Sequence, residues 1–309
     1  MKIPIVAVVG STASGKTALG IEIAKRFNGE VVSCDSMQIY KNLDIGTAKP
    51  SKEEMQGIAH HMLDIAEPDE NFSVGRFCTA AHKVIEEIHA RGKLPVLVGG
   101  TGLYIDNIVF ETKFCAPPRD EKLSEELLCY AKEHSNEALF ALLQKEDPEA
   151  AKKLHPNDLK RVIRAIETVR TSKKTRAQLD LESRSGPSKY NCLYLAIDME
   201  RETLYSRINR RVDIMLEQGL EKETLKYIYP MRKKGVTALQ AIGYKEMLWY
   251  LEGKCTYGEM KNLLARNTRR YAKRQLTWFR ANKSIHWLPQ AEAIDEASLL
   301  ITEMKGAFI

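Results

Sequence analysis

The segment from Gly10 to Thr17 has the residue types and the spacing of a phosphate-binding loop. It reads Gly-Ser-Thr-Ala-Ser-Gly-Lys-Thr, which matches G-x-x-x-x-G-K-[ST] between a predicted strand and a predicted helix. Glycines let the backbone turn with its amides pointing inward, the helix N-terminus favours an anion, and Lys16 adds a positive charge. The Thr17 hydroxyl is suited to Mg²⁺. The pattern predicts that phosphate is bound and leaves open whether it is transferred.

Acidic residues near this loop are few. A loop of this kind that hydrolyses a nucleotide usually works with an acid at the end of a neighbouring strand. The apolar run "LPVLV" ends instead in Gly99-Gly100-Thr101, and the nearest strand-terminal acid is Asp35. Because the carboxyl ends of parallel strands line one crevice, we expect Asp35 and Thr101 to face the same site as Lys16. Asp35 is either a helix or turn cap or a general base.

A pair of arginines lies on a predicted helix over residues 201–219. Arg207 and Arg211 are four residues apart and share one face, so they repel each other unless an anion lies between them. A solvated basic face is the alternative interpretation.

A second basic segment runs from Arg266 to Lys283, with seven basic residues and no acid. On a helix, most of its cations gather on one side, and another stripe holds Leu264, Tyr271, Gln275 and Trp278. An ordinary basic surface and a nucleic-acid contact are both compatible with this pattern. The interleaved aromatic residues favour nucleic acid.

Strand and helix signals alternate through most of the chain. Strands are expected at 3–10, 29–36, 60–65, 93–100, 191–198 and 284–289, which indicates a parallel α/β sheet. Between Pro117 and Lys189 only amphipathic helices are expected. We therefore predict an α/β core, residues 1–116 and 190–309, interrupted by an all-helical insertion domain, residues 117–189.

The composition is that of an ordinary globular protein of the cytoplasm. The 309 residues are 44% hydrophobic and 28% charged, with a net charge of +6. The six cysteines form no C-x-x-C pair, which is typical of free thiols in a reducing compartment. We see no apolar run long enough for a bilayer and no secretory signal. His60 and His61 lack partners at ligand spacing, so we interpret them as structural or surface residues.

Seven segments together resemble one family, the bacterial tRNA dimethylallyltransferases, also called tRNA isopentenyltransferases. They are "GSTASGKTALG", "CDSMQIYKNLDIGTAKP", "HHMLDI", "LVGGTGLYI", "LHPNDLKRVIRAIE", "QAIGYKEM" and "AKRQLTWFR", in the family's order and nearly end to end. The resemblance implies a P-loop core like that of nucleotide kinases and a mobile, tRNA-contacting helical insertion. No Cys/His finger follows the last helix, as in the short bacterial form.

The resemblance also implies a reaction. The dimethylallyl group of dimethylallyl diphosphate would pass to the exocyclic N6 amine of the adenosine 3′-adjacent to the anticodon in tRNA, and diphosphate would leave. The acceptor base would have to leave its stack. The implied partners are the anticodon stem-loop of tRNA and dimethylallyl diphosphate, with Mg²⁺ as cofactor. We expect a cytoplasmic monomer without membrane contact.

Site residues carry over by position. Asp35 matches the base and Thr101 the hydroxyl at the reacting centre, and Thr17 is the candidate Mg²⁺ ligand. Diphosphate binding falls on Gly10, Ser11, Thr12, Ala13, Ser14, Gly15, Lys16, Thr17 and Arg211. tRNA binding falls on Asp35, Ser36, Met37, Gln38, Thr101, Leu123, Lys160, Arg161, Val162, Ile163, Arg164, Gln240, Ala241, Ile242, Gly243, Tyr244 and Lys245.

Three alternative functions stay open on the residues alone. A P-loop kinase acting on a small nucleoside-like acceptor would explain the loop and Asp35, but not the Gly-Gly-Thr strand end or the basic helices. An RNA-binding protein could use the loop as a nucleotide switch. A prenyltransferase acting on free adenine nucleotides would share the chemistry and differ only in the acceptor.

Overall fold

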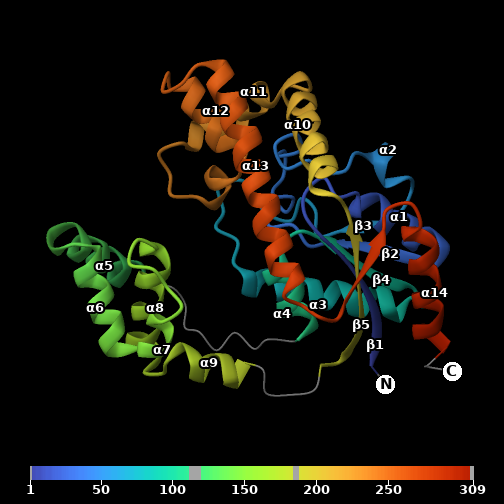
Figure 1. The fold of residues 1–309 in the computed structure, drawn as a ribbon, viewed down its shortest axis with the longest axis horizontal. Coiled ribbons are helices and arrows are strands. Elements are labelled where there is room, and N and C mark those ends of the chain that lie inside the picture. The colour runs from blue at the N-terminus through green and yellow to red at the C-terminus, as the bar shows by residue number, and fades with distance from the viewer. Residues whose placement is uncertain (1, 111–119, 184–187, 307–309) are drawn as a thin grey trace. The chain divides into compact units, whose positions relative to one another are not determined.

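Six parallel strands form the centre of the protein. The computed structural model describes residues 2–110, 120–183 and 188–306 (Figure 1). The strand order is β3-β2-β4-β1-β5-β6. The strands are β1 (Ile3–Val9), β2 (Gly29–Ser33), β3 (His60–His61), β4 (Leu94–Gly99), β5 (Tyr190–Asp198) and β6 (Ile285–Pro289). The predicted parallel α/β sheet is confirmed, with Val6 of β1 paired to Val96 on one side and to Leu193 on the other.

The third strand is shorter than the sequence suggests. A strand was expected over residues 60–65, and β3 contains only His60 and His61. Met62 and Asp64 adopt positive φ angles of 65° and 54°, in the left-handed region, so the extended backbone cannot continue. The apolar pattern of this segment is used to bury Met62 in the core rather than to lengthen the sheet.

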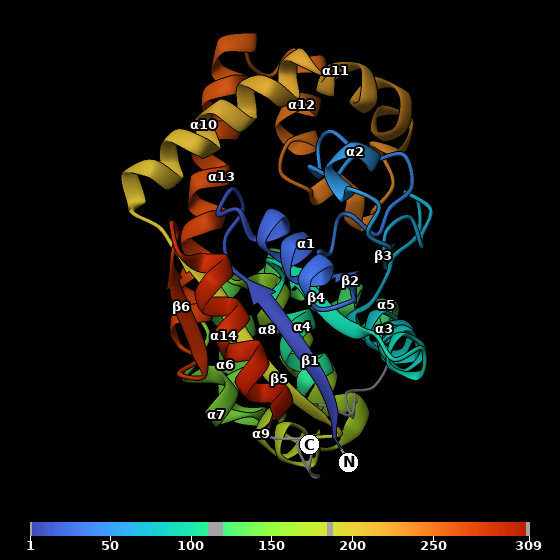
Figure 2. The same ribbon diagram turned by 90° about the vertical axis from the view of Figure 1, so that its right-hand side faces the viewer.

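Helices cover both faces of the sheet. On one face, α1 (Lys16–Arg26) and α14 (Ala293–Gly306) pack against alternate residues such as Val6 and Val8 (Figure 2). On the other face, α3 (Val74–Ala90) and α4 (Gly102–Val109) pack against Ile5 and Ala7. Because successive strand residues point to opposite faces, a strand covered on both sides is apolar throughout, which explains the continuous β-branched run of β1.

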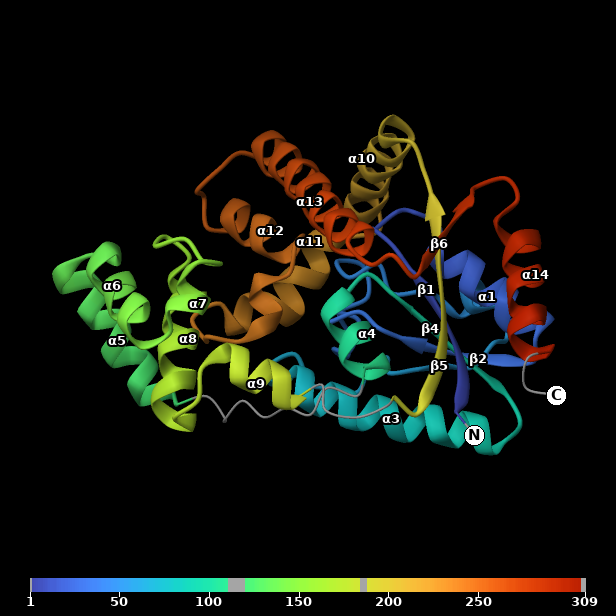
Figure 3. The ribbon, with the colours of Figure 1, turned by 60° about the horizontal axis from the view of Figure 1, so that its bottom comes forward.

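A third group of helices lies beyond the carboxyl ends of the strands (Figure 3). It contains α10 (Arg201–Glu217), α11 (Leu220–Glu223), α12 (Tyr244–Leu251) and α13 (Tyr257–Arg280). Short turns at Thr224–Ile228, Tyr229–Met231 and Thr237–Gln240 connect these helices, and α2 (Lys52–Met55) precedes β3. This group closes the crevice in which ligands of parallel sheets bind.

The chain divides into two compact units, residues 1–109 with 188–309 and residues 110–187. The second unit contains α5 (Glu121–His134), α6 (Asn136–Glu146), α7 (Pro148–Ala151), α8 (Leu159–Ser172) and α9 (Arg176–Ser183). The insertion was placed at 117–189, and Pro117 and Pro118 lie outside the described residues. The second unit buries its own core, including Leu139, Leu143 and Ile166.

The residues at which the chain leaves the first unit and returns to it are in contact. The Ser188 hydroxyl donates a hydrogen bond of 2.6 Å to the carbonyl of Val109. The last residue of α4 is thereby joined to a residue two positions before β5.

Candidate active site

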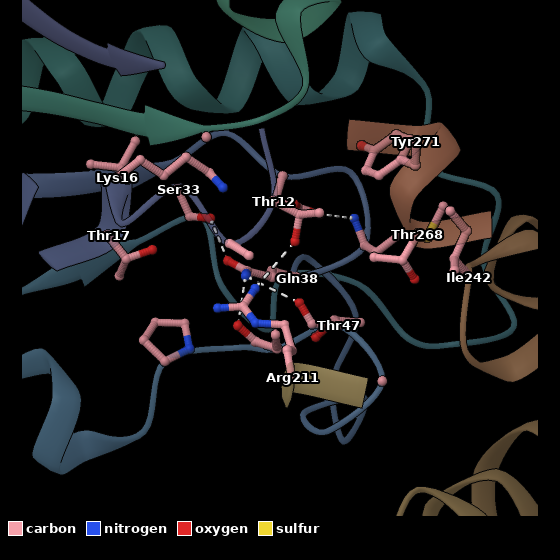
Figure 4. A pocket seen from close by; sticks show the side chains of 18 of the residues that line it. Thr12, Lys16, Thr17, Ser33, Gln38, Thr47, Arg211, Ile242, Thr268 and Tyr271 are labelled. Carbon is pink, nitrogen blue, oxygen red and sulfur yellow. Dashed lines mark hydrogen bonds between the residues drawn. The ribbon is translucent and has the colours of Figure 1, made fainter. Parts of the chain in front are cut away.

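A cavity of about 540 Å³ opens at the carboxyl ends of the strands. Its wall comes from the phosphate loop, the residues after β2, the loop around Gly46, α10, residues 240–242 and α13. In Figure 4, Thr12, Lys16 and Arg211 point into this space from three directions. The volume is in the range of small-molecule sites, and the lining mixes cationic, hydroxyl and apolar groups.

The phosphate loop has the geometry that its glycines predict. Gly15 has a φ of 92°, a left-handed conformation that a side chain would strain, and α1 begins at the next residue. Lys16 Nζ donates to the carbonyl of Ser11 over 3.2 Å. In the part of the chain described, the buried hydroxyls of Ser11 and Ser14 have no hydrogen-bond partner. Orphaned donors of this kind at a helix N-terminus suit a phosphate ligand.

Two cations lie at the loop, Lys16 and Arg211, and neither forms an ion pair with a carboxylate among the described residues. Burial, and secondarily the charge of Arg211, lower the pKa of Lys16 to about 8, while Asp35 acts in the opposite direction. Burial also lowers the pKa of Arg211, whose guanidinium donates to the Thr12 hydroxyl over 3.2 Å. Two desolvated positive charges near each other are unfavourable, and an anion bound between them would remove that cost.

Arg207 lies on the same side of α10 as Arg211. A Cβ atom placed on Gly15 would be 3.7 Å from an Arg207 guanidinium nitrogen, so this arginine also reaches the loop. Arg207 is exposed, whereas Arg211 is half-buried and lines the cavity. Both arginines thus reach the phosphate loop, Arg207 from the solvent side and Arg211 from within the cavity.

Asp35 follows β2 and lines the cavity. Its Oδ1 accepts a hydrogen bond of 2.9 Å from the amide of Met37, so the residue does make the turn that one interpretation assigned to it. This bond fixes the carboxylate at the cavity wall. The Asp35 side chain can therefore cap the turn and also serve as a general base.

Thr101 acts on the same turn from the end of β4. Its Oγ1 accepts the amide of Ser36 over 3.2 Å, so it holds the residue next to Asp35. On this strand the cavity lining reaches Gly99, and Thr101 lies just behind it. Tyr271 of α13 completes this wall; burial, and secondarily the Asp35 carboxylate, raise the pKa of its hydroxyl.

Helix α13 supplies residues that sequence reasoning missed. Gln275 is 6% exposed; its Oε1 accepts the amide of Thr12 and its Nε2 donates to the carbonyl of Gly100, each over 2.9 Å. Thr268 and Tyr271 line the cavity from the same helix. A glutamine inside an apolar stripe was the available signal, because a buried amide needs partners.

A buried glutamate, Glu223, holds the loop around Gly46 that forms part of the cavity wall. Glu223 accepts the amides of Asp44, Ile45 and Gly46 over 2.8–2.9 Å, and the hydroxyl of Tyr244 over 2.6 Å. The loop held in this way offers the carbonyls of Thr47 and Ala48 to the Gln38 amide, whose oxygen accepts from Ser33. Glu223 was not predicted, since its charge pattern is that of a surface helix.

The predicted tRNA-binding residues are divided between the two units. Ser36, Met37, Gln38, Gln240, Ala241 and Ile242 line the cavity. Gly243 and Tyr244 are buried behind it, and Lys245 is exposed. Leu123 and Lys160 to Arg164 belong to the second unit. There Val162 and Ile163 are core residues, so the side chains available to a partner on α8 include Lys160 and Arg161.

His60 also lines the cavity, while His61 does not. The His60 Nδ1 lies 2.9 Å from the carbonyl of Ile58, and burial lowers the pKa of the ring. His61 contacts the buried Glu30 carboxylate over 2.7 Å, together with Arg91 and Lys93. His61 thus has the structural role predicted for it, and His60 is a wall residue.

The fold and the site together define a P-loop α/β protein whose pocket is lined by Lys16, Arg211 and the Asp35 carboxylate. A family profile described as IPP transferase matches residues 38–282. The chain belongs to the IPP transferase family.

Known relatives are similar in sequence to this protein over nearly the whole chain. The tRNA dimethylallyltransferase of Acetivibrio thermocellus is 48% identical over 301 residues, covering 97% of this chain and 96% of the relative. That of Bacillus subtilis is 44% identical over 294 residues, covering 95% and 93%.

Solved structures show the same fold. The full-length tRNA isopentenylpyrophosphate transferase of Bacillus halodurans superposes with a TM-score of 0.72 at 44% identity, over 98% of this chain and 96% of that one. A eukaryotic dimethylallyltransferase acting on tRNA gives a TM-score of 0.81 at 30% identity, over 97% and 79%. Among the described residues, no helix has the length and apolar character needed to cross a bilayer.

Proposed function

We propose that this protein transfers the dimethylallyl group of dimethylallyl diphosphate to the N6 amine of the adenosine 3′-adjacent to the anticodon in tRNA. Relatives of 44–48% identity carry the name tRNA dimethylallyltransferase. The observation that supports this most strongly is the pairing of Lys16 and Arg211 at the phosphate loop, with Asp35 on the same cavity wall. The strand beside β1 ends in Gly99 rather than an acid, which suits a diphosphate that leaves intact.

In the reaction, the amine nitrogen attacks the allylic carbon, and the bond between that carbon and the diphosphate oxygen breaks. The electron pair of this bond leaves on the diphosphate, where Lys16, Arg211 and the loop amides stabilise it. Asp35 accepts the amine proton. Thr101 holds the Asp35 turn by accepting the amide of Ser36, and its hydroxyl also forms a hydrogen bond with Tyr271.

A magnesium ion fits the donors present. The Thr17 hydroxyl lines the cavity next to Lys16 and is the oxygen donor that a phosphate loop offers to Mg²⁺. Within the described residues no cluster of three or more His, Cys, Asp or Glu could hold a metal alone, so Thr17 and the diphosphate oxygens would carry most of the coordination. When bound, the ion would neutralise charge on the departing diphosphate.

Transfer to tRNA is tested with purified protein, Mg²⁺ and unmodified tRNA. Addition of dimethylallyl diphosphate should increase the tRNA mass by one five-carbon group, and labelled ATP should leave no phosphate on RNA or nucleoside. AMP in place of tRNA separates a tRNA enzyme from one that acts on free nucleotides. Asp35→Asn should bind tRNA and fail to turn over; unchanged turnover would exclude Asp35 as the base. We expect the enzyme to act in the cytoplasm and as a monomer. Sedimentation of the purified protein checks the oligomeric state.

A further inference from the structure

Trp278, near the end of α13, is a large apolar side chain held at the surface in one orientation. It is 47% exposed, and its indole N–H donates to the Asp106 carboxylate over 2.9 Å. The indole lies on Gly102 at the start of α4, where an added Cβ would come within 2.3 Å of the ring. The glycine and the hydrogen bond fix the ring while leaving about half of it uncovered.

The surroundings of Trp278 differ from those of the stripe to which its spacing assigns it. Leu264 and Gln275 of that stripe are 1% and 6% exposed, whereas Trp278 reaches the surface. Leu103 of α4, which follows Gly102 in the chain, is also 47% exposed. Helices α4 and α13 contact each other (Figures 1 and 3), and each carries a large apolar side chain that reaches solvent. An exposed apolar surface held in place is typical of a binding site.

The charges on α13 indicate what such a surface would bind. Arg266, Arg270, Arg274 and Trp278 follow one another at intervals of four residues, so they form a row along one flank of the helix. The three arginines are exposed, and Arg274 also lines the cavity. The row therefore leads from the active site to Trp278, and α13 carries no acid beyond Glu259.

We propose that Trp278 is a stacking platform for the base of a tRNA nucleotide that flanks the acceptor adenosine, with Arg270 and Arg274 on the adjoining phosphates. Removal of the acceptor from its stack leaves neighbouring bases with uncovered faces, and single-stranded bases are held on aromatic side chains. Because Asp106 and Gly102 already fix the indole, the ring loses little conformational entropy when a base binds to it. The inference rests on the proposed function and adds a base contact outside the cavity.

The first test compares variants of two aromatic residues on one helix. Tyr257, at the other end of α13, is 45% exposed and provides a matched control. Trp278→Ala should weaken binding of the unmodified anticodon stem-loop roughly tenfold, the effect of losing one stacked base. Its KM for dimethylallyl diphosphate should stay within about twofold of wild type, because Trp278 does not line the cavity. Trp278→Phe should restore most of the affinity, and Tyr257→Ala should bind RNA like wild type.

The second test uses the native side chain, so it does not depend on how Trp278→Ala folds. In the double variant Trp249→Phe, Trp287→Phe, the remaining tryptophan emission comes from Trp278. Addition of the stem-loop should quench this emission and protect it from acrylamide. Dimethylallyl diphosphate alone should do neither.

The outcomes separate this inference from the proposed function. If wild-type protein prenylates tRNA while Trp278→Ala binds the stem-loop with unchanged affinity, the platform is wrong and the function stands. Trp278 emission that is shielded from acrylamide before RNA is added would also exclude the platform, because part of the protein itself would then cover the ring. If wild-type protein does not prenylate tRNA, the proposed function fails first.

Discussion

Thr12 of the phosphate loop and Gln275 of α13 lie 263 positions apart in the chain and are joined by a hydrogen bond of 2.9 Å. The other end of the same amide binds the carbonyl of Gly100 after β4. One buried side chain therefore fixes the loop, a strand end and the last long helix of the core relative to one another.

Replacement of this amide should affect stability and diphosphate binding together. Gln275→Leu leaves a buried amide and a buried carbonyl without partners, at a cost of about 1–3 kcal/mol for each group. We expect a lower Tm by calorimetry and a higher KM for dimethylallyl diphosphate. Gln275→Glu keeps the acceptor for Thr12 but adds a negative charge beside the diphosphate, so its KM should rise further. Equal KM values in the two variants would contradict this electrostatic effect.

The pH dependence of diphosphate binding should reflect Lys16. Because burial lowers its pKa to about 8, the free protein loses this charge as the pH rises through that value. An anion favours the charged form, so affinity should be highest below pH 8 and fall about tenfold per pH unit above it. Isothermal titration with pyrophosphate between pH 6.5 and 9.5 measures the slope. The raised pKa of the Tyr271 hydroxyl keeps that group neutral over this range.

Lys16→Arg is the control for this titration. An arginine keeps its charge across the whole range, so any binding that remains should not weaken between pH 8 and 9.5. A wild-type dissociation constant that is flat between pH 7 and 9.5 would show that Lys16 is not the group concerned.

Glu223 should be more important than Tyr244 for the loop of residues 44–46. The carboxylate accepts three backbone amides in addition to the tyrosine hydroxyl. Glu223→Ala leaves three amides unpaired, of which that of Gly46 is buried, and we expect a loss of about 3 kcal/mol in unfolding free energy. Tyr244→Phe removes one of the four donors and should cost about 1 kcal/mol, by the same principle. Urea denaturation distinguishes the two, and equal losses would contradict the assignment.

The two arginines of α10 should differ in their effect on turnover. Arg211 is half-buried at the loop and binds Thr12, so Arg211→Gln should reduce kcat/KM for dimethylallyl diphosphate by at least about a hundredfold, as expected for a desolvated charge at the leaving group. Arg207 is exposed, and solvent screens its charge, so Arg207→Gln should reduce it by only about tenfold or less. Initial rates at varied diphosphate concentration test the order.

Much of the fold could be predicted because its signals are local. The β-branched runs, the glycine loop and the turn residues each lie within a few positions, and the parallel sheet and the family are confirmed. The exception is β3, where the positive φ of Met62 ends a strand that the apolar pattern would extend. Aspartate adopts this conformation more often than most residues, so Asp64 carries a weak signal for it, whereas Met62 carries none.

The site was less accessible to sequence reasoning because its contacts are distant in the chain. Asp35 and Lys16 could be brought together by the topology of parallel strands alone. The contacts of Gln275 with Thr12 and of Glu223 with Gly46 depend on how the helices of residues 201–280 fold back over the strand ends. Spacing on α13 likewise placed Trp278 with buried neighbours, and only the packing on α4 turns it to the surface. The catalytic roles of Asp35 and Thr101 remain predictions.

The hydrogen bond between Ser188 and Val109 holds together the two points at which the chain leaves and re-enters the first unit around residues 110–187. Since the chain leaves and returns at one point, a short glycine linker could replace that unit without stretching the sheet. Insertions of different sizes could therefore be exchanged at this junction during evolution while the sheet keeps its strands.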